Sequence, residues 1–230
     1  MGNFGAETVF GGLIRGSLQI LMRVEIHPTH PQKRLISMAR DKLLGDGVIV
    51  YPTDSCYALG CTLGSHNAIR RIRAIRRMSD QHYLTLVCRD LSELSTFARV
   101  DNACYRLLKS LTPGPYTFIL QATRELPRRL RDPKRKTIGL RIPQHPVTSA
   151  LLQAVGIPML SATARDVSGG MELSDPDEID EHFGRRIDMF LDAGAGGAQP
   201  TTVIDLSSGD PVLVRRGLGE VEHLLDLEGS

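Results

Sequence analysis

Residues 48–60 read VIVYPTDSCYALG, and this stretch decides the fold class. It begins with Val48 to Tyr51, a continuous apolar run, rich in β-branched side chains, that lies between Gly47 and Pro52. An apolar run bounded by turn residues in this way predicts a buried strand.

Small hydroxyl residues follow the predicted strand directly. Side chains just beyond a strand end lie where α/β sheets bind their ligands, so Thr53 and Ser55 are candidates to contact a small polar substrate. Tyr57 adds a flat ring with a hydroxyl tip. The same local chemistry also fits a capped turn that leads into a helix, and the sequence leaves both interpretations open.

Elsewhere, segments of helical spacing alternate with short apolar runs. Apolar spacing of three and four predicts helices at 32–44, 67–77, 91–97, 102–111, 147–155 and 176–183. Strands are predicted at 83–88, 116–122, 137–142, 159–162 and 188–191, with a hairpin over 202–206 and 211–214. This order predicts a mixed sheet covered by helices, which is an α/β fold.

The composition is that of an ordinary globular chain. The 230 residues are 41% hydrophobic and 23% charged, and neither a repeat nor a long polar linker divides them. We therefore predict one domain over 23–224, preceded by a weakly ordered extension over 1–22. The apolar runs are too short to span a bilayer, and the N-terminus does not have the pattern of a secretory signal.

The four cysteines, Cys56, Cys61, Cys88 and Cys104, lack both Cys-x-x-Cys spacing and a following histidine pair, so a zinc site is not indicated. An even count also permits disulfides. Because the chain is large and shows no export signal, we predict free thiols, no bound metal held by side chains and a cytoplasmic location.

Positive charge is concentrated in two segments, although the net charge is only +2. Five arginines lie within 70–77, and eight lysines and arginines lie within 124–141. Such clusters indicate a polyanionic ligand on one face, or equally a pair of solvated helix faces.

Further candidates lie near the ends of other predicted strands, where hydroxyl groups and arginines recur. They are Thr117, Arg141, His145, Ser161, Thr163, Arg165 and Arg215. Each segment alone also fits a structural role. Together they match what a phosphate-binding cleft requires, and because the chain has no Walker-type phosphate loop, side chains and loop amides would have to hold a nucleotide.

In this order, and over most of 48–217, the segments resemble the YrdC-like family of threonylcarbamoyl-AMP synthases, most closely its YciO branch. The resemblance rests on PTDSCYALG (52–60), TPGPYT (112–117), RIPQHP (141–146), SATAR (161–165) and PTTVIDL (200–206). It implies a twisted mixed α/β domain with a large concave basic groove. It also implies that L-threonine, bicarbonate and ATP, with Mg²⁺, give threonylcarbamoyl-AMP and pyrophosphate for tRNA modification.

The resemblance also implies roles for individual residues. Substrate-binding positions are Thr53, Ser55, Tyr57, Arg141 and His145; nucleotide-binding positions are Thr117, Ser161 and Arg215; catalytic positions are Arg76, Thr163 and Arg165.

The chain departs from the synthase pattern at three positions. Met78 and His82 stand where the synthases carry cations, and Arg165 stands where they carry asparagine. Because cations stabilise the charge that develops on phosphates, we expect the changes at Met78 and His82 to weaken the synthase reaction. Arg165 either restores positive charge or accommodates a differently charged ligand. Two alternatives stay open: a hydrolase acting on threonylcarbamoyl groups, and a module that binds tRNA or double-stranded RNA on its basic face.

Overall fold

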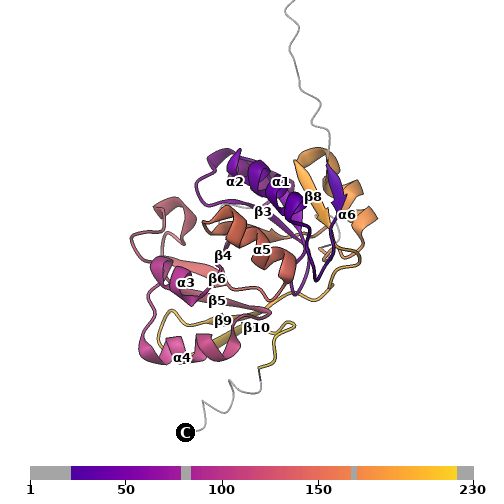
Figure 1. Cartoon of the computed structure of the whole chain (residues 1–230). Helices are drawn as coiled ribbons and strands as arrows, with labels where there is room; N and C mark the ends of the chain where they lie inside the picture. The colour runs from indigo at the N-terminus through magenta and orange to yellow at the C-terminus, as the bar shows by residue number, and fades with distance from the viewer. Residues whose placement is uncertain (1–21, 79–83, 167–169, 222–230) are drawn as a thin grey trace, which may run out of the picture.

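A ten-stranded mixed sheet lies at the centre of the described residues, which are 22–78, 84–166 and 170–221 of a computed structural model. Its strands follow the order β1-β8-β2-β3-β7-β4-β6-β5-β9-β10 (Figure 1). The pairs β1–β8, β2–β8, β4–β6 and β5–β9 are parallel, and the other pairs are antiparallel. The predicted α/β class with a mixed sheet is confirmed.

The elements alternate irregularly along the chain. The strands are β1 (Arg23–Glu25), β2 (Ile49–Tyr51), β3 (Ala58–Thr62), β4 (Thr85–Val87), β5 (Tyr116–Gln121), β6 (Thr137–Arg141), β7 (Met159–Thr163), β8 (Met189–Asp192), β9 (Thr202–Asp205) and β10 (Val212–Arg215). The helices are α1 (Lys33–Leu44), α2 (His66–Ile75), α3 (Leu91–Phe97), α4 (Asn102–Leu111), α5 (Pro146–Val155) and α6 (Pro176–Phe183), with short 3₁₀ turns η1 (Arg128–Leu130) and η2 (Gly184–Arg186).

Strand β2 is buried on both faces, as its apolar sequence predicts. Ile49 and Tyr51 join the hydrophobic cluster of α1 and α5, whereas Val50 joins the cluster on the opposite face. The neighbouring strands β3, β7 and β8 alternate between the two clusters in the same way. Burial on both faces explains why these strands carry apolar residues at consecutive positions.

Helices cover the two faces unequally. Helices α2, α3, α4 and α6 contribute buried residues to one cluster, and α1 packs beside α5 in the other. On this second face, the strands β4, β5, β6 and β9 carry short or hydroxyl side chains that line an open cleft. These residues are Thr85, Thr117, Thr137, Gly139 and Val203. Their sequence neighbours, such as Phe118 and Leu140, are buried on the opposite face. The site therefore lies on the part of the sheet that α1 and α5 leave open.

Two strands were not predicted. The segment after the Pro-Thr-Asp-Ser turn is strand β3, which pairs antiparallel with both β2 and β7, so the alternative of a turn leading into a helix is excluded. Strand β1 pairs parallel with β8 far along the chain. The pairs with β7 and β8 are long-range, and local patterns do not reveal them. The predicted late hairpin is confirmed as β9 and β10. Most of the predicted extension, residues 1–21, lies outside the described part, as do 222–224.

Within the described residues, no helix combines the length and the apolar character needed to cross a membrane.

The loop after β8 packs directly on the Pro-Thr-Asp-Ser turn. A side-chain carbon at Gly197 would overlap the backbone carbonyl oxygen of Ser55, and one at Gly196 would lie 2.6 Å from the ring of Tyr57. These glycines therefore allow the loop after β8 to touch the turn after β2, although the two segments are far apart in the sequence.

We predict that Gly197→Ala lowers the melting temperature by about 4–8 °C, because backbone must move to relieve the overlap. Gly64→Ala is the matched control, since nothing lies within 4 Å of the added carbon at that turn. Thermal unfolding of both variants measures the difference. Equal melting temperatures would show that the two loops do not need close contact.

Candidate functional site

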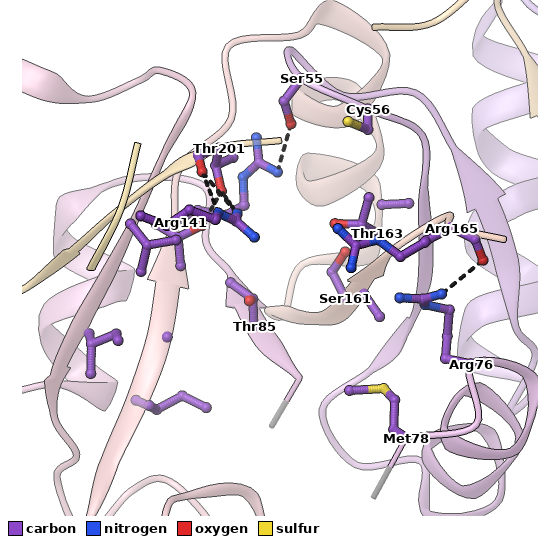
Figure 2. A pocket seen from close by; sticks show the side chains of 18 of the residues that line it. Ser55, Cys56, Arg76, Met78, Thr85, Arg141, Ser161, Thr163, Arg165 and Thr201 are labelled. Carbon is purple, nitrogen blue, oxygen red and sulfur yellow. Dashed lines mark hydrogen bonds between the residues drawn. The ribbon is translucent and has the colours of Figure 1, made fainter. Parts of the chain in front are cut away.

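A cleft of about 430 Å³ lies over the open part of the sheet. Strands β4, β5, β6, β7 and β9 form its floor, and the turn at 55–58 together with Arg76 and Met78 contributes to its walls. Figure 2 shows labelled side chains from these separate elements converging on one space. Its volume is within the range of small-molecule sites.

Hydroxyl groups line the floor of the cleft. They belong to Thr85, Thr117, Thr137, Ser161, Thr163 and Thr201. Thr117 and Thr201 share a hydrogen bond of 2.9 Å between their hydroxyl oxygens, and Ser161 accepts one of 3.0 Å from Tyr51. Such groups both donate and accept, so the floor can orient a polar ligand without adding charge.

The cleft is strongly cationic. Five arginines line it, namely Arg76, Arg135, Arg141, Arg165 and Arg215, against a single carboxylate, Asp132, among the described lining residues. Carboxylates outside the lining pair with three of these arginines: Asp205 with Arg135, Asp54 with Arg141 and Glu172 with Arg165.

Arg76 and Arg215 have no carboxylate within ion-pair distance among the described residues. Arg76 donates to the carbonyl oxygen of Arg165 at 2.8 Å, and Arg215 donates to the carbonyl oxygen of Thr201 at 2.9 Å. Burial, followed by the charge of Arg165, lowers the pKa of both guanidinium groups below its ordinary value. A bound anion would relieve this repulsion, so the two side chains favour a negatively charged ligand.

Three of the lining arginines also hold a buried Nε atom that has no hydrogen-bond partner among the described residues. They are Arg76, Arg141 and Arg165. Buried polar atoms are ordinarily hydrogen-bonded, so unpaired donors gathered around one cleft indicate that a ligand or solvent completes the site.

An ion pair joins the Pro-Thr-Asp-Ser turn to the segment that follows β6. The Arg141 guanidinium pairs with the Asp54 carboxylate, which also accepts from the backbone of Gln144 at 2.8 Å. The second amino group of Arg141 donates to Ser55 at 3.4 Å. Asp54 therefore occupies part of Arg141 and holds the turn in place.

Hydrogen bonds inside the Pro-Thr-Asp-Ser turn, and one from helix α5, also hold this turn in place. The hydroxyl of Thr53 donates to the carbonyl oxygen of Cys56 at 2.6 Å and accepts from the amide of Ser55 at 3.2 Å. Thr148 of α5 donates to the carbonyl oxygen of Pro52 at 2.6 Å. These bonds orient Ser55 and Cys56 toward the cleft (Figure 2).

The structure brings most of the predicted site residues together. Those lining the cleft are Ser55, Tyr57, Arg76, Thr117, Arg141, Ser161, Thr163, Arg165 and Arg215. Thr53 and His145 instead line a separate cavity of about 130 Å³ behind the turn, which the ring of Tyr57 also borders.

Tyr57 does not offer its hydroxyl to the cleft. The hydroxyl donates to the carbonyl oxygen of Gly194 at 2.7 Å and accepts from the amide of Ala193 at 2.9 Å. Its ring packs edge-on against Phe190, and burial raises its pKa to about 12. Tyr57 thus anchors the turn to the loop after β8.

His145 caps helix α5. Its Nδ1 accepts a hydrogen bond of 3.2 Å from the backbone amide of Val147, and burial lowers its pKa below the ordinary value. The neutral ring therefore suits the cap, because only an unprotonated Nδ1 can accept.

Several lining residues were not among the sequence candidates: Cys56, Thr85, Asp132, Arg135, Thr137, Gly139 and Thr201. A signal for some of them is present in the strands. Positions 137, 139 and 141 of β6 line the cleft, as does Ile138, whereas Ile138 and Leu140 also belong to the hydrophobic cluster on the opposite face. Of the departures, Met78 and Arg165 line the cleft, and His82 lies outside the described residues.

The described residues do not build a protein-held site for Mg²⁺. They contain no group of three or more histidine, cysteine or acidic side chains that could hold a metal. Asp132 is the one carboxylate among the described residues that line the cleft. Magnesium keeps several waters and binds substrate phosphates, so it would have to enter with a nucleotide.

Comparisons with known proteins were made against family models, curated sequences and solved structures. The family model Sua5/YciO/YrdC, described as telomere recombination, matches residues 41–217. The Escherichia coli K12 protein YciO, described as uncharacterized, is 52% identical over 87% of this chain and 97% of its own length. Its crystal structure superimposes with a TM-score of 0.84 at 51% identity, covering 87% of this chain and 98% of that one.

Two further relatives carry more specific names. A protein of Chromobacterium violaceum named threonylcarbamoyl-AMP synthase is 33% identical, over 79% of this chain and 94% of its own length. The crystal structure of P. abyssi Sua5 complexed with L-threonine has a TM-score of 0.81. It is 24% identical and covers 91% of this chain and 61% of that one, so this likeness concerns the fold alone.

The lowered pKa of His145 predicts a pH dependence of stability. The folded state disfavours protonation, so the contribution of His145 is present above the ordinary histidine pKa of about 6.5 and is lost as pH falls below it. His145→Asn keeps a capping side chain that does not titrate. Urea unfolding at neutral and mildly acidic pH should show a smaller loss of stability for the variant than for the unmodified protein, and equal losses would contradict this role.

Proposed function

The chain belongs to the Sua5/YciO/YrdC family, and from this premise we propose that its cleft binds ATP and L-threonine and forms threonylcarbamoyl-AMP with bicarbonate. The protein would be a nucleotidyltransferase of tRNA threonylcarbamoyladenosine modification, working in the cytoplasm. The observation that carries the proposal is the state of the cleft arginines. Arg76 and Arg215 have no ion-pair partner among the described residues and have lowered pKa values. Arg76, Arg141 and Arg165 each hold a buried Nε donor without a hydrogen-bond partner among the described residues. The relative named threonylcarbamoyl-AMP synthase supports the reaction.

In the proposed reaction, the protein positions the reactants and neutralises the negative charge of the phosphates. The amine of threonine attacks bicarbonate with loss of water, or CO₂ with loss of a proton, to give a carbamate. A carbamate oxygen then attacks the α-phosphorus of ATP, and the bond from that phosphorus to the β-phosphate oxygen breaks to release pyrophosphate. Arg76, Arg165 and Arg215 would contact the phosphates, since guanidinium groups bind phosphate oxygens in pairs. Thr117, Ser161 and Thr163 would orient the nucleotide from the floor.

Threonine would occupy the end of the cleft near the Pro-Thr-Asp-Ser turn. Ser55 offers a hydroxyl there, and Arg141 offers the Nε that Asp54 does not engage. Thr53, Tyr57 and His145 would act indirectly, because their polar atoms are engaged in holding the turn, the following loop and α5.

The four cysteines are free thiols, which fits the proposed reducing compartment. Burial raises the pKa of Cys56 to about 11, so its thiol in the cleft stays protonated at neutral pH and adds no charge to compete with a phosphate.

The synthase proposal predicts pyrophosphate release that requires L-threonine, bicarbonate and ATP together. Gly139→Leu should reduce it at least about tenfold, because the added side chain grows from the floor between Thr85 and Thr117 into the cleft. Gly64→Leu is the matched control at an open turn. No release by the purified protein at high concentration, or equal rates in both variants, would refute the proposal.

A second candidate function, binding of tRNA or double-stranded RNA, is favoured by a groove of about 1000 Å³ beside the cleft. Its five cations have no ion-pair partner among the described residues: Arg99, Arg124, Arg128, Arg131 and Lys136. No aromatic side chain is among the described residues that line it, so it is suited to phosphates rather than to stacked bases. Nearby, Arg70 and Arg73 of α2 line a hollow together with Arg129, which unites the two basic segments of the sequence.

If the groove binds an RNA backbone, affinity must fall steeply with added salt. Replacing both Arg128 and Arg131 by glutamate should weaken duplex RNA binding and lower the slope of log affinity against log salt by about 2. The control replaces Lys33 and Arg34, exposed at the start of α1, in the same way. Fluorescence anisotropy at several salt concentrations measures this, and an unchanged slope would refute the candidate.

A hydrolase acting on threonylcarbamoyl groups gains no specific support from the geometry.

A further inference from the structure

Arg165 is held by a carboxylate that lies just outside the cleft. Its guanidinium pairs with Glu172, and the two residues face each other across an isolated β-bridge. The side chain of Glu172 is 13% exposed, whereas that of Arg165 is 38% exposed and lines the cleft. Figure 2 shows Arg165 extending beside Thr163, with Arg76 bonded to its backbone. Arg165 therefore lies between an internal carboxylate and the space that a ligand would enter.

Glu172 acts on more than its direct partner. Among the described residues, it is the one carboxylate whose charge raises the pKa of Arg76 and of Arg215, while Arg165 lowers the pKa of both. Its charge also reaches Cys56 in the cleft. Within the described part of the chain, three guanidinium groups thus share Glu172 as a counter-ion, which balances only part of their positive charge.

We propose that Glu172 is a specificity-determining residue, whose carboxylate competes with anionic ligands for Arg165 and so favours ligands with several negative charges. This inference rests on the proposed use of the cleft for phosphate groups. A small anion that relies on Arg165 must displace this arginine from its ion pair with Glu172, and it gains few other contacts in return. A pyrophosphate or triphosphate chain is long enough to contact Arg76 and Arg215 as well, and these contacts offset the cost of displacing Glu172.

The chemical consequence is selection of the polyphosphate end of a nucleotide over small anions such as bicarbonate or a carboxylate.

Isothermal titration of the full chain with inorganic pyrophosphate and with inorganic phosphate tests the proposal. Glu172→Gln removes the competing charge and keeps the shape, so we expect both anions to bind more tightly, phosphate by about tenfold and pyrophosphate by less. The preference for pyrophosphate should therefore shrink. Glu93→Gln is the matched control, since it neutralises a carboxylate paired with Arg89 away from the cleft, and it should change neither affinity.

A second comparison covers the case in which Glu172→Gln does not fold. Arg165→Gln alone leaves Glu172 uncompensated beside Arg76 and Arg215, so pyrophosphate should bind weakly. Adding Glu172→Gln replaces the ion pair by two amides and should recover at least about tenfold in affinity over Arg165→Gln.

Weaker binding in Glu172→Gln would show that the carboxylate only positions Arg165, and unchanged preference or no recovery in the double variant would likewise overturn the proposal. Because these measurements use inorganic anions, they do not depend on synthase activity. If the unmodified protein binds pyrophosphate and releases none in the synthase assay, the proposed reaction fails while this inference stands. If it binds no pyrophosphate, this inference fails, and the synthase assay alone decides the proposed reaction.

Discussion

The ion pair between Asp54 and Arg141 is the constraint on which the site depends. It joins the turn after β2 to the end of β6, two strands that β3, β7 and β4 separate in the sheet. Both side chains are about nine-tenths buried. A buried pair of this kind contributes little net stability, but removing one partner leaves an uncompensated charge, so it specifies one arrangement of the two loops. With the turn held there, Ser55 and Cys56 face the cleft, and Thr53 faces away.

The cleft itself follows from an incomplete helix layer. Helices α1 and α5 bury Ile49, Tyr51 and their neighbours on one part of the sheet, and the strands beyond them present Thr85, Thr117 and Gly139 instead. Hydroxyl and glycine residues do not require burial, so the sheet face can stay open, with Ile119 and Val203 as partly buried apolar residues among them. Arginines from strand ends and from the end of α2 then surround this floor. The arginines around the cleft thus supply the positive charge of the site, and the strands of the sheet determine its shape.

Part of this arrangement can be predicted from the sequence. The apolar run at 48–51, the turn that follows it and the hydroxyls and arginines at strand ends indicate an α/β sheet with a phosphate-binding cleft, and nine of the predicted site residues meet there. The contacts made by side chains cannot be predicted in the same way. The commitment of the Tyr57 hydroxyl to Gly194, the capping role of His145 and the pairing of Arg165 with Glu172 depend on segments brought together only by folding. Strand β3 was missed because alanine and glycine have weak strand propensity and because one of its two partners, β7, is distant in the sequence.

A crystal structure with L-threonine and a non-hydrolysable ATP analogue tests the central claim most directly, which is that the open face of the sheet binds a nucleotide through its unbalanced arginines. The account predicts the phosphates within hydrogen-bond distance of Arg76 and Arg215, the adenosine over the hydroxyl floor and threonine near Ser55 and Arg141. Nucleotide phosphates bound elsewhere, with the cleft arginines still bonded only to the protein, would contradict it.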